Sequence, residues 1–292
     1  MASARPSSSP VTQAAARIEQ PRRQLGALEA PGGHAGECDA LLALGNPAID
    51  GALGGGLGSS TLHEIAAARE AEVAAASAFA LALAARMTSW RRATAAIADS
   101  CKAREDERAV SLPVSGRSVI WIAEDLSLVE NGVLYGPALD GVGIAPERLI
   151  TVAAARMRDV LWAMEEALRC RAVGMVIGEM RPRGIDQVAT RRFALAAAAG
   201  NALGLMLYTA PDEVPSAAVT RWIVGAASSP NAERGHRIGP PRLLARLARN
   251  RRGPLGTWIV EWNSVEQRFE LATHSEPVAG AAFDRPHRTA VA

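Results

Sequence analysis

The stretch LGNPAIDGALGGGLG, residues 44–58, leads into TLHEI, residues 61–65, which has the pattern of a short β-strand. A glycine cluster near the start of an α/β domain suggests a phosphate-binding loop. A dinucleotide fingerprint, however, lies between a strand and the helix that follows it, and here the glycines precede the strand. The glycines are therefore predicted to form turns with positive φ, and a ligand-binding loop is the alternative.

The second observation on this region is the near absence of lysine. Of the 32 Lys and Arg residues, one is a lysine, Lys102, and the others are arginine, as a GC-rich genome also favours. A P-loop requires GxxxxGK[ST], in which lysine reaches the phosphates and the hydroxyl binds Mg²⁺. The dipeptide Gly-Lys does not occur in the sequence. A standard P-loop and a lysine-rich nucleic-acid tail are therefore excluded.

Outward from this stretch, apolar segments alternate with amphipathic ones. Strands are predicted at 61–65, 118–122, 149–152, 173–177 and 203–208, and helices at 74–87, 159–171 and 186–199. Strands that alternate with helices indicate an α/β fold with a parallel sheet flanked by helices. The later apolar segments, 220–226, 242–249, 257–262 and 267–271, predict strands that extend the same sheet in antiparallel fashion.

Composition divides the chain into a folded domain and two tails. Residues 1–36 are rich in Ser, Pro, Gly, Ala and Arg and are predicted to be disordered, as are residues 276–292. The domain is expected at 37–275, with a polar insertion at 88–117 between a helix and a strand.

Charge and metal-ligating residues exclude several kinds of site. The net charge of +2 gives no overall nucleic-acid signature, so any basic site must be local. The three cysteines and five histidines are scattered without the spacing of a zinc site or a disulfide framework. We expect no metal and no cofactor, no transmembrane helix, and a location in the reducing cytoplasm.

Residues 48–57 with 62–65 resemble the entry to the ATPase core of RecA, which runs directly into the P-loop. Aligned by position, Glu72, Val73 and Ala74 stand where the P-loop glycine, lysine and Ser/Thr would be. A carboxylate at this place would repel phosphate. The acidic residues that such ATPases use to activate water and bind Mg²⁺ correspond to Glu124 or Asp125 and to Glu179.

A closer resemblance covers nearly the whole predicted domain. Five segments recur in order and are similar to the ImuA family, especially its alphaproteobacterial branch: GVLYGPAL (132–139), LWAMEEALRC (161–170), ATRR (189–192), AVTRW (218–222) and RNRRGPxGxWxxEW (249–262). The resemblance implies a RecA-like core with a degraded P-loop and a role in damage-induced mutagenesis. ImuA-like proteins act with ImuB, a Y-family-like protein without polymerase activity, and with an error-prone DnaE-type polymerase.

Basic residues gather near the C-terminal end of the predicted domain. They are Arg242, Arg246, Arg249, Arg251 and Arg252, and together with the neutral Asn250 they are called the arginine strip below. In a strand, Arg242 and Arg246 share one face with Leu244. Such a strip suits DNA phosphates or an acidic partner, and a charged edge that prevents aggregation is the third interpretation.

Three further features have two interpretations each. Tyr135 is expected in an exposed loop, where it would stack on a base or contact a protein. Trp162 is expected in the core, beside an i,i+4 pair of Glu165 and Arg169, and a partner surface is its alternative. The pair Arg191–Arg192 is expected on a solvated helix face, with DNA phosphate as the alternative.

The sequence therefore predicts a RecA-like α/β scaffold that works by binding. We expect a non-catalytic accessory factor of mutagenic translesion synthesis in the SOS response, which joins an ImuB-like protein and an error-prone polymerase. RecA and DNA are further candidate partners. The alternatives are a modulator of RecA filaments and a divergent ATPase in which Arg69 replaces the lysine.

Overall fold

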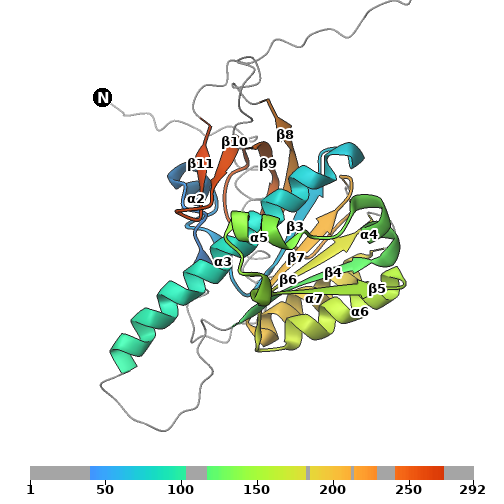
Figure 1. Ribbon diagram of the computed structural model, residues 1–292, viewed down its shortest axis with the longest axis horizontal. Coiled ribbons are helices and arrows are strands. Elements are labelled where there is room, and N and C mark those ends of the chain that lie inside the picture. Colours follow the sequence, from blue (N-terminus) through green and yellow to red (C-terminus); the bar gives the residue numbers. More distant parts are fainter. Residues whose placement is uncertain (1–39, 103–116, 182–184, 212–213, 229–240, 273–292) are drawn as a thin grey trace, which may run out of the picture. The chain divides into compact units, whose positions relative to one another are not determined.

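The computed structural model describes residues 40–102, 117–181, 185–211, 214–228 and 241–272 (Figure 1). The predicted tails, 1–36 and 276–292, lie outside these ranges. The helices are α2 (Pro47–Ala52), α3 (Val73–Lys102), α4 (Asp125–Asn131), α5 (Gly136–Val142), α6 (Met157–Arg169) and α7 (Gln187–Gly200). The strands are β1 (Leu41–Leu42), β2 (Leu57–Gly58), β3 (Leu62–Ala67), β4 (Ser118–Glu124), β5 (Leu149–Ala154), β6 (Val173–Met180), β7 (Leu203–Tyr208), β8 (Thr220–Ala227), β9 (Arg242–Asn250), β10 (Gly256–Asn263) and β11 (Arg268–Leu271).

One large sheet organises the described part of the chain. Its strand order is β11-β10-β9-β8-β3-β7-β6-β4-β5. The strands from β8 to β5 in this order are parallel, and β9, β10 and β11 are antiparallel to their neighbours. The predicted fold class, a RecA-like parallel sheet with an antiparallel C-terminal extension, is confirmed by these strand directions.

Strand β8 differs from its prediction. We expected residues 220–226 to open the antiparallel extension, but β8 runs parallel to β3, with His63 opposite Thr220 and Glu64 opposite Arg221. The antiparallel part begins only with β9, which pairs with the other edge of β8. The alternation of apolar residues determines which face of a strand is buried. This alternation is the same in a parallel and in an antiparallel strand, so the sequence pattern could not determine the direction of β8.

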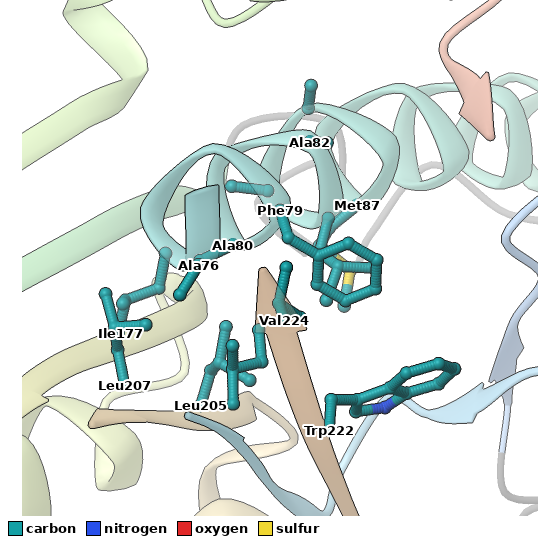
Figure 2. Close-up of a cluster of buried hydrophobic side chains, with 14 of the residues drawn as sticks. Ala76, Phe79, Ala80, Ala82, Met87, Ile177, Leu205, Leu207, Trp222 and Val224 are labelled. Carbon is teal, nitrogen blue, oxygen red and sulfur yellow. The ribbon is translucent and has the colours of Figure 1, made fainter. Parts of the chain in front are cut away.

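Helices cover both faces of the sheet. The α3 side chains pack on one face, and α6 and α7 pack on the other (Figure 1). On the α3 face, Phe79 lies 5.5 Å from Trp222 of β8, measured between ring centroids, and Val224 belongs to the same buried cluster (Figure 2). Burial on both faces explains why β3, β6 and β7 read as almost continuous apolar runs.

Helix α3 is longer than predicted. We expected it to end at Met87, but it continues to Lys102, through the first half of the predicted polar insertion. Alanine and arginine favour a helix without any need for burial, which the apolar periodicity did not reveal. The segment Glu70–Trp90 is long and apolar enough to cross a membrane, but half of it is buried against the sheet, as expected of a core helix.

The glycine-rich stretch forms turns, as predicted. The Asn46 side chain caps α2, and Gly54, Gly55 and Gly56 follow this helix with positive φ. A Cβ atom on Gly56 would lie 2.4 Å from the carbonyl oxygen of Leu42, so only glycine fits there. The stretch thereby returns the chain to β2, which pairs with β1.

Candidate functional site

The residues that we aligned with a P-loop, Glu72 to Ala74, follow β3 and include the first two residues of α3. A 3₁₀ turn, Glu70–Glu72, follows β3, and α3 begins at Val73. The Val73 side chain is buried in the core and Ala74 contributes an exposed methyl group, so neither supplies a group that binds phosphate. The structure thus brings these residues to the carboxyl end of β3, where ligands of parallel α/β sheets bind.

The negatively charged side chain of Glu72 lies at this end of β3. The Glu72 carboxylate accepts a hydrogen bond from Arg69 Nη2 at 2.7 Å, and this bond holds the pKa of Glu72 below its usual range. The backbone N–H of Ala226 in β8 donates to the same carboxylate. A Cβ on Gly225 would lie only 3.0 Å from Glu72 Oε2, so Glu72 packs closely against β8.

Arg69 is the residue that a divergent ATPase would use in place of lysine. Its guanidinium is largely exposed, and it is paired with Glu72 in a salt bridge. Any anion that approached this turn would meet the Glu72 carboxylate as well. The arrangement therefore presents a neutralised pair where a phosphate-binding loop presents free N–H groups and a lysine.

Glu179 occupies a buried position near the end of β6. Its carboxylate accepts hydrogen bonds from Trp121 Nε1 at 3.3 Å and from Asn131 Nδ2 at 2.7 Å. These two neutral donors belong to β4 and to the end of α4, so Glu179 joins three elements. Its place at the end of the strand agrees with the sequence analysis, although β6 continues to Met180, beyond the predicted bound at residue 177.

The structure does not place the other predicted carboxylates on the same face as Glu179. Ile122 of β4 lies opposite Gly178 of β6. Because side chains alternate along strands, Glu124 shares the face of Gly178, and Glu179 points to the other face. Asp125 is exposed in the first turn of α4. The acidic residues therefore gather at one end of the sheet without converging on one point.

The arginine strip is divided between different contacts. Arg242 is buried and forms a 2.5 Å salt bridge with Glu261 of β10, so it is not available to a partner, contrary to our prediction. Arg246 is exposed, and Arg251 donates to the carbonyl oxygen of Ser216 at 2.9 Å. The Asn250 side chain donates to the carbonyl oxygen of Ala52 and accepts from the backbone N–H of Arg252, which is a structural role.

The sequence analysis missed a buried charged centre beside the strip. Glu64 of β3 is fully buried and accepts a 2.6 Å hydrogen bond from Arg221 Nε of β8. Its other oxygen, Oε1, has no hydrogen-bond partner among the described residues. Burial lowers the pKa of Arg249, and the charges of Arg251 and Arg221 add to this effect. The only signal in the sequence was a carboxylate inside an apolar strand.

His63, the neighbour of Glu64, is a second buried polar group of β3. Its Nδ1 lies 2.8 Å from Thr220 Oγ1, and its Nε2 lies 2.9 Å from Thr61 Oγ1 and 3.0 Å from the carbonyl oxygen of Gly58. Complete burial lowers the pKa of His63 to about 4. His63 is therefore neutral at physiological pH and connects β3 to β8.

Helix α6 confirms one prediction and corrects another. Glu165 and Arg169 form the predicted i,i+4 salt bridge, and Arg192 of α7 pairs with the same carboxylate. Trp162, which we expected in the core, has 66% of its surface exposed because it lies on the opposite side of α6 from Val160, Met164 and Leu168. Tyr135 is exposed, as predicted.

Comparisons with known proteins agree with the resemblance seen in the sequence. The chain is 29% identical over 233 residues to Protein ImuA of Caulobacter vibrioides strain NA1000 / CB15N, which covers 76% of this chain and 83% of the relative. Protein ImuA of strain ATCC 19089 gives the same identity and coverage. No family model matches the chain.

Among solved structures, the crystal structure of the RadB recombinase matches with a TM-score of 0.48 and 13% identity. The match covers 80% of this chain and all of the RadB chain. Caulobacter is an alphaproteobacterium, the group to which the resemblance of the five segments pointed. The curated relatives therefore support the resemblance to the ImuA family.

Proposed function

We propose that this chain is a non-catalytic accessory factor of mutagenic translesion DNA synthesis in the DNA-damage response. It acts as an adaptor for an ImuB-like protein and an error-prone DnaE-type polymerase. The similarity to Protein ImuA supports involvement in a damage-inducible mutagenesis system. The structural observation that carries the proposal is the Arg69–Glu72 pair at the start of α3.

Phosphoryl transfer needs groups that neutralise the phosphates and place Mg²⁺. At this position the chain has a carboxylate in Glu72, followed by the apolar Val73 and Ala74. The only lysine, Lys102, lies at the other end of α3. A helix rises 1.5 Å per residue, so Lys102 is about 43 Å from Val73 along the axis. These facts support a scaffold that binds proteins without hydrolysing nucleotides.

The adaptor role is tested by purifying the full chain together with the ImuB-like protein of the same organism. We expect a complex that survives gel filtration at low and moderate salt. Repeated failure to form a complex over several salt concentrations would exclude the adaptor role.

The absence of ATPase activity needs its own experiment. The full chain is titrated with fluorescently labelled ATP and Mg²⁺, in parallel with Arg69→Ala. We expect no saturable binding for either protein. Saturable binding by the wild type that is lost in Arg69→Ala would instead support the divergent ATPase.

A further inference from the structure

Helix α4 exposes two of its three large apolar side chains. Its only buried residue is Ser127, whereas Leu126 is 50% and Val129 82% exposed. A surface helix normally turns its apolar residues toward the core. α4 packs on β4 and β5, with Ser127 buried and Leu128 half-buried against the core, and it leaves Leu126 and Val129 on the outside.

The exposed apolar residues continue beyond α4. Gly132 ends the helix with a φ of +83°, and Val133 and Tyr135 follow with 72% and 70% of their surfaces exposed. Within ten residues, four large apolar side chains therefore face outward. We call Leu126, Val129, Val133 and Tyr135 the α4 surface. Single exposed apolar residues are common, but a group of this kind marks an interaction site.

The charges around the α4 surface are mainly negative. Glu124 and Asp125 lie at the start of α4, and Glu130 lies at its end. Among the described residues, Arg181 opposes these three carboxylates, since its Nη2 forms a 2.5 Å salt bridge with Glu130. An apolar centre with a charged margin is the usual composition of a protein–protein interface. The negative margin disfavours nucleic acid, because phosphates would be repelled.

We propose that the α4 surface binds a basic, amphipathic segment of a partner protein. The apolar side of the segment covers Val129 and its neighbours, and its basic residues pair with Asp125 and Glu124. This inference rests on the proposed adaptor function and gives that function a location. It also gives a use to carboxylates that stand at nucleotide-site positions in a chain without a P-loop.

The direct test uses a synthetic peptide of about 18 residues, with leucine at helical i, i+3, i+4, i+7 spacing and arginine elsewhere. The full chain is titrated against this peptide, labelled with fluorescein, and against a peptide in which glutamate replaces each arginine. We expect the basic peptide to bind and the acidic one not to bind. Equal binding of the two peptides, or preference for the acidic one, would overturn the inference.

Variants locate the binding to the α4 surface. Val129→Ser should weaken binding of the basic peptide by about tenfold or more, as expected for a residue at the centre of an interface. Val265→Ser is the matched control, because Val265 is 92% exposed in the turn between β10 and β11. Both variants should retain the melting temperature of the wild type. Equal binding of the peptide by both would contradict the location.

Two further measurements separate this inference from the proposed function. If the ImuB-like protein forms a complex equally well with wild type and Val129→Ser, the adaptor role stands and the α4 surface is excluded as its site. If the ImuB-like protein does not bind but the basic peptide binds at Val129, the adaptor role fails and the surface stands. A change of sedimentation coefficient in Val129→Ser alone would assign the surface to a second copy and overturn the inference.

Discussion

Arg69 and Glu72 form a salt bridge of 2.7 Å across the turn between β3 and α3, with the Glu72 carboxylate directly beside β8. The pair places a protein carboxylate near the carboxyl end of β3, the edge at which parallel α/β sheets bind ligands. The negative charge of Glu72 repels an anionic ligand. The carboxylate is held close to Gly225, and the neighbouring Val73 side chain is buried, so neither residue offers a group that binds an anion.

The contact between Glu72 and β8 predicts that Gly225→Ala is destabilising. The added methyl group would lie 3.0 Å from Glu72 Oε2 and 3.2 Å from Ala68 Cβ. We expect a loss of about 1–2 kcal/mol in the free energy of unfolding, measured by urea denaturation. Combining the change with Glu72→Ala should recover part of the loss, because one of the two close contacts is removed.

Gly141→Ala in α5 is the control for this experiment, because its Cβ would meet nothing within 4 Å. A helical glycine replaced by alanine should leave the protein equally or slightly more stable. Equal losses in both variants would show that Glu72 does not pack against Gly225 as described.

The pair of Glu64 and Arg221 predicts a large difference between two arginine substitutions. Arg221→Met removes the charged partner of a fully buried carboxylate, and we expect a loss of about 3–5 kcal/mol in the free energy of unfolding. Arg268→Met breaks salt bridges to Glu266 and Glu270 at the surface, where about 1 kcal/mol or less is at stake. Similar losses in the two variants would contradict the buried position of Glu64.

His63 predicts how stability changes with pH. Its pKa in the folded protein is about 4, below the ordinary 6.5, because the imidazole is buried. Between these values the unfolded chain binds a proton that the folded chain does not, so stability is complete above pH 6.5 and decreases toward pH 4. The difference between the two pKa values corresponds to a loss of about 3 kcal/mol in the free energy of unfolding once both states are protonated.

The measurement is the free energy of unfolding at several pH values between 4 and 7. In His63→Gln the group that titrates is absent, so its stability should vary less over this range than that of the wild type. A wild type and a variant with the same pH profile would show that His63 is not the source of the effect.

Two tryptophans predict opposite results. Trp162→Ala should change the free energy of unfolding by no more than about 0.5 kcal/mol, because its side chain is mostly exposed. Trp222→Ala removes a fully buried ring that contacts Phe79 and Trp258, and we expect a loss of about 3–5 kcal/mol. Acrylamide quenching gives a second readout. The easily quenched fluorescence of the exposed Trp162 should be lost in Trp162→Ala and retained in Trp222→Ala.

The sequence predicted the elements that depend on local pattern. β7 has the predicted bounds, Leu203–Tyr208, and Asp186 caps α7 as its position near the helix start suggested. Apolar alternation and helical periodicity are properties of neighbouring residues, so they can be read from a single chain.

Features that depend on distant residues were not predicted. Arg242 is buried because Glu261, on the next strand, neutralises it, and Trp162 is exposed because none of the described helices or strands covers that side of α6. The pairing of Glu64 with Arg221 joins residues 157 positions apart. Each of these results depends on which strands and helices become neighbours, and a linear pattern does not contain that information.

The length of α3 has a practical consequence. Its last residue is the only lysine of the chain, so a protease specific for lysine has a single peptide bond to cut, directly after α3. That cut would separate β3 and α3 from all strands that pair with or follow them in the large sheet. The rate of this cleavage therefore reports on the end of one helix, and lysine-directed cross-links to a partner would all start from that point.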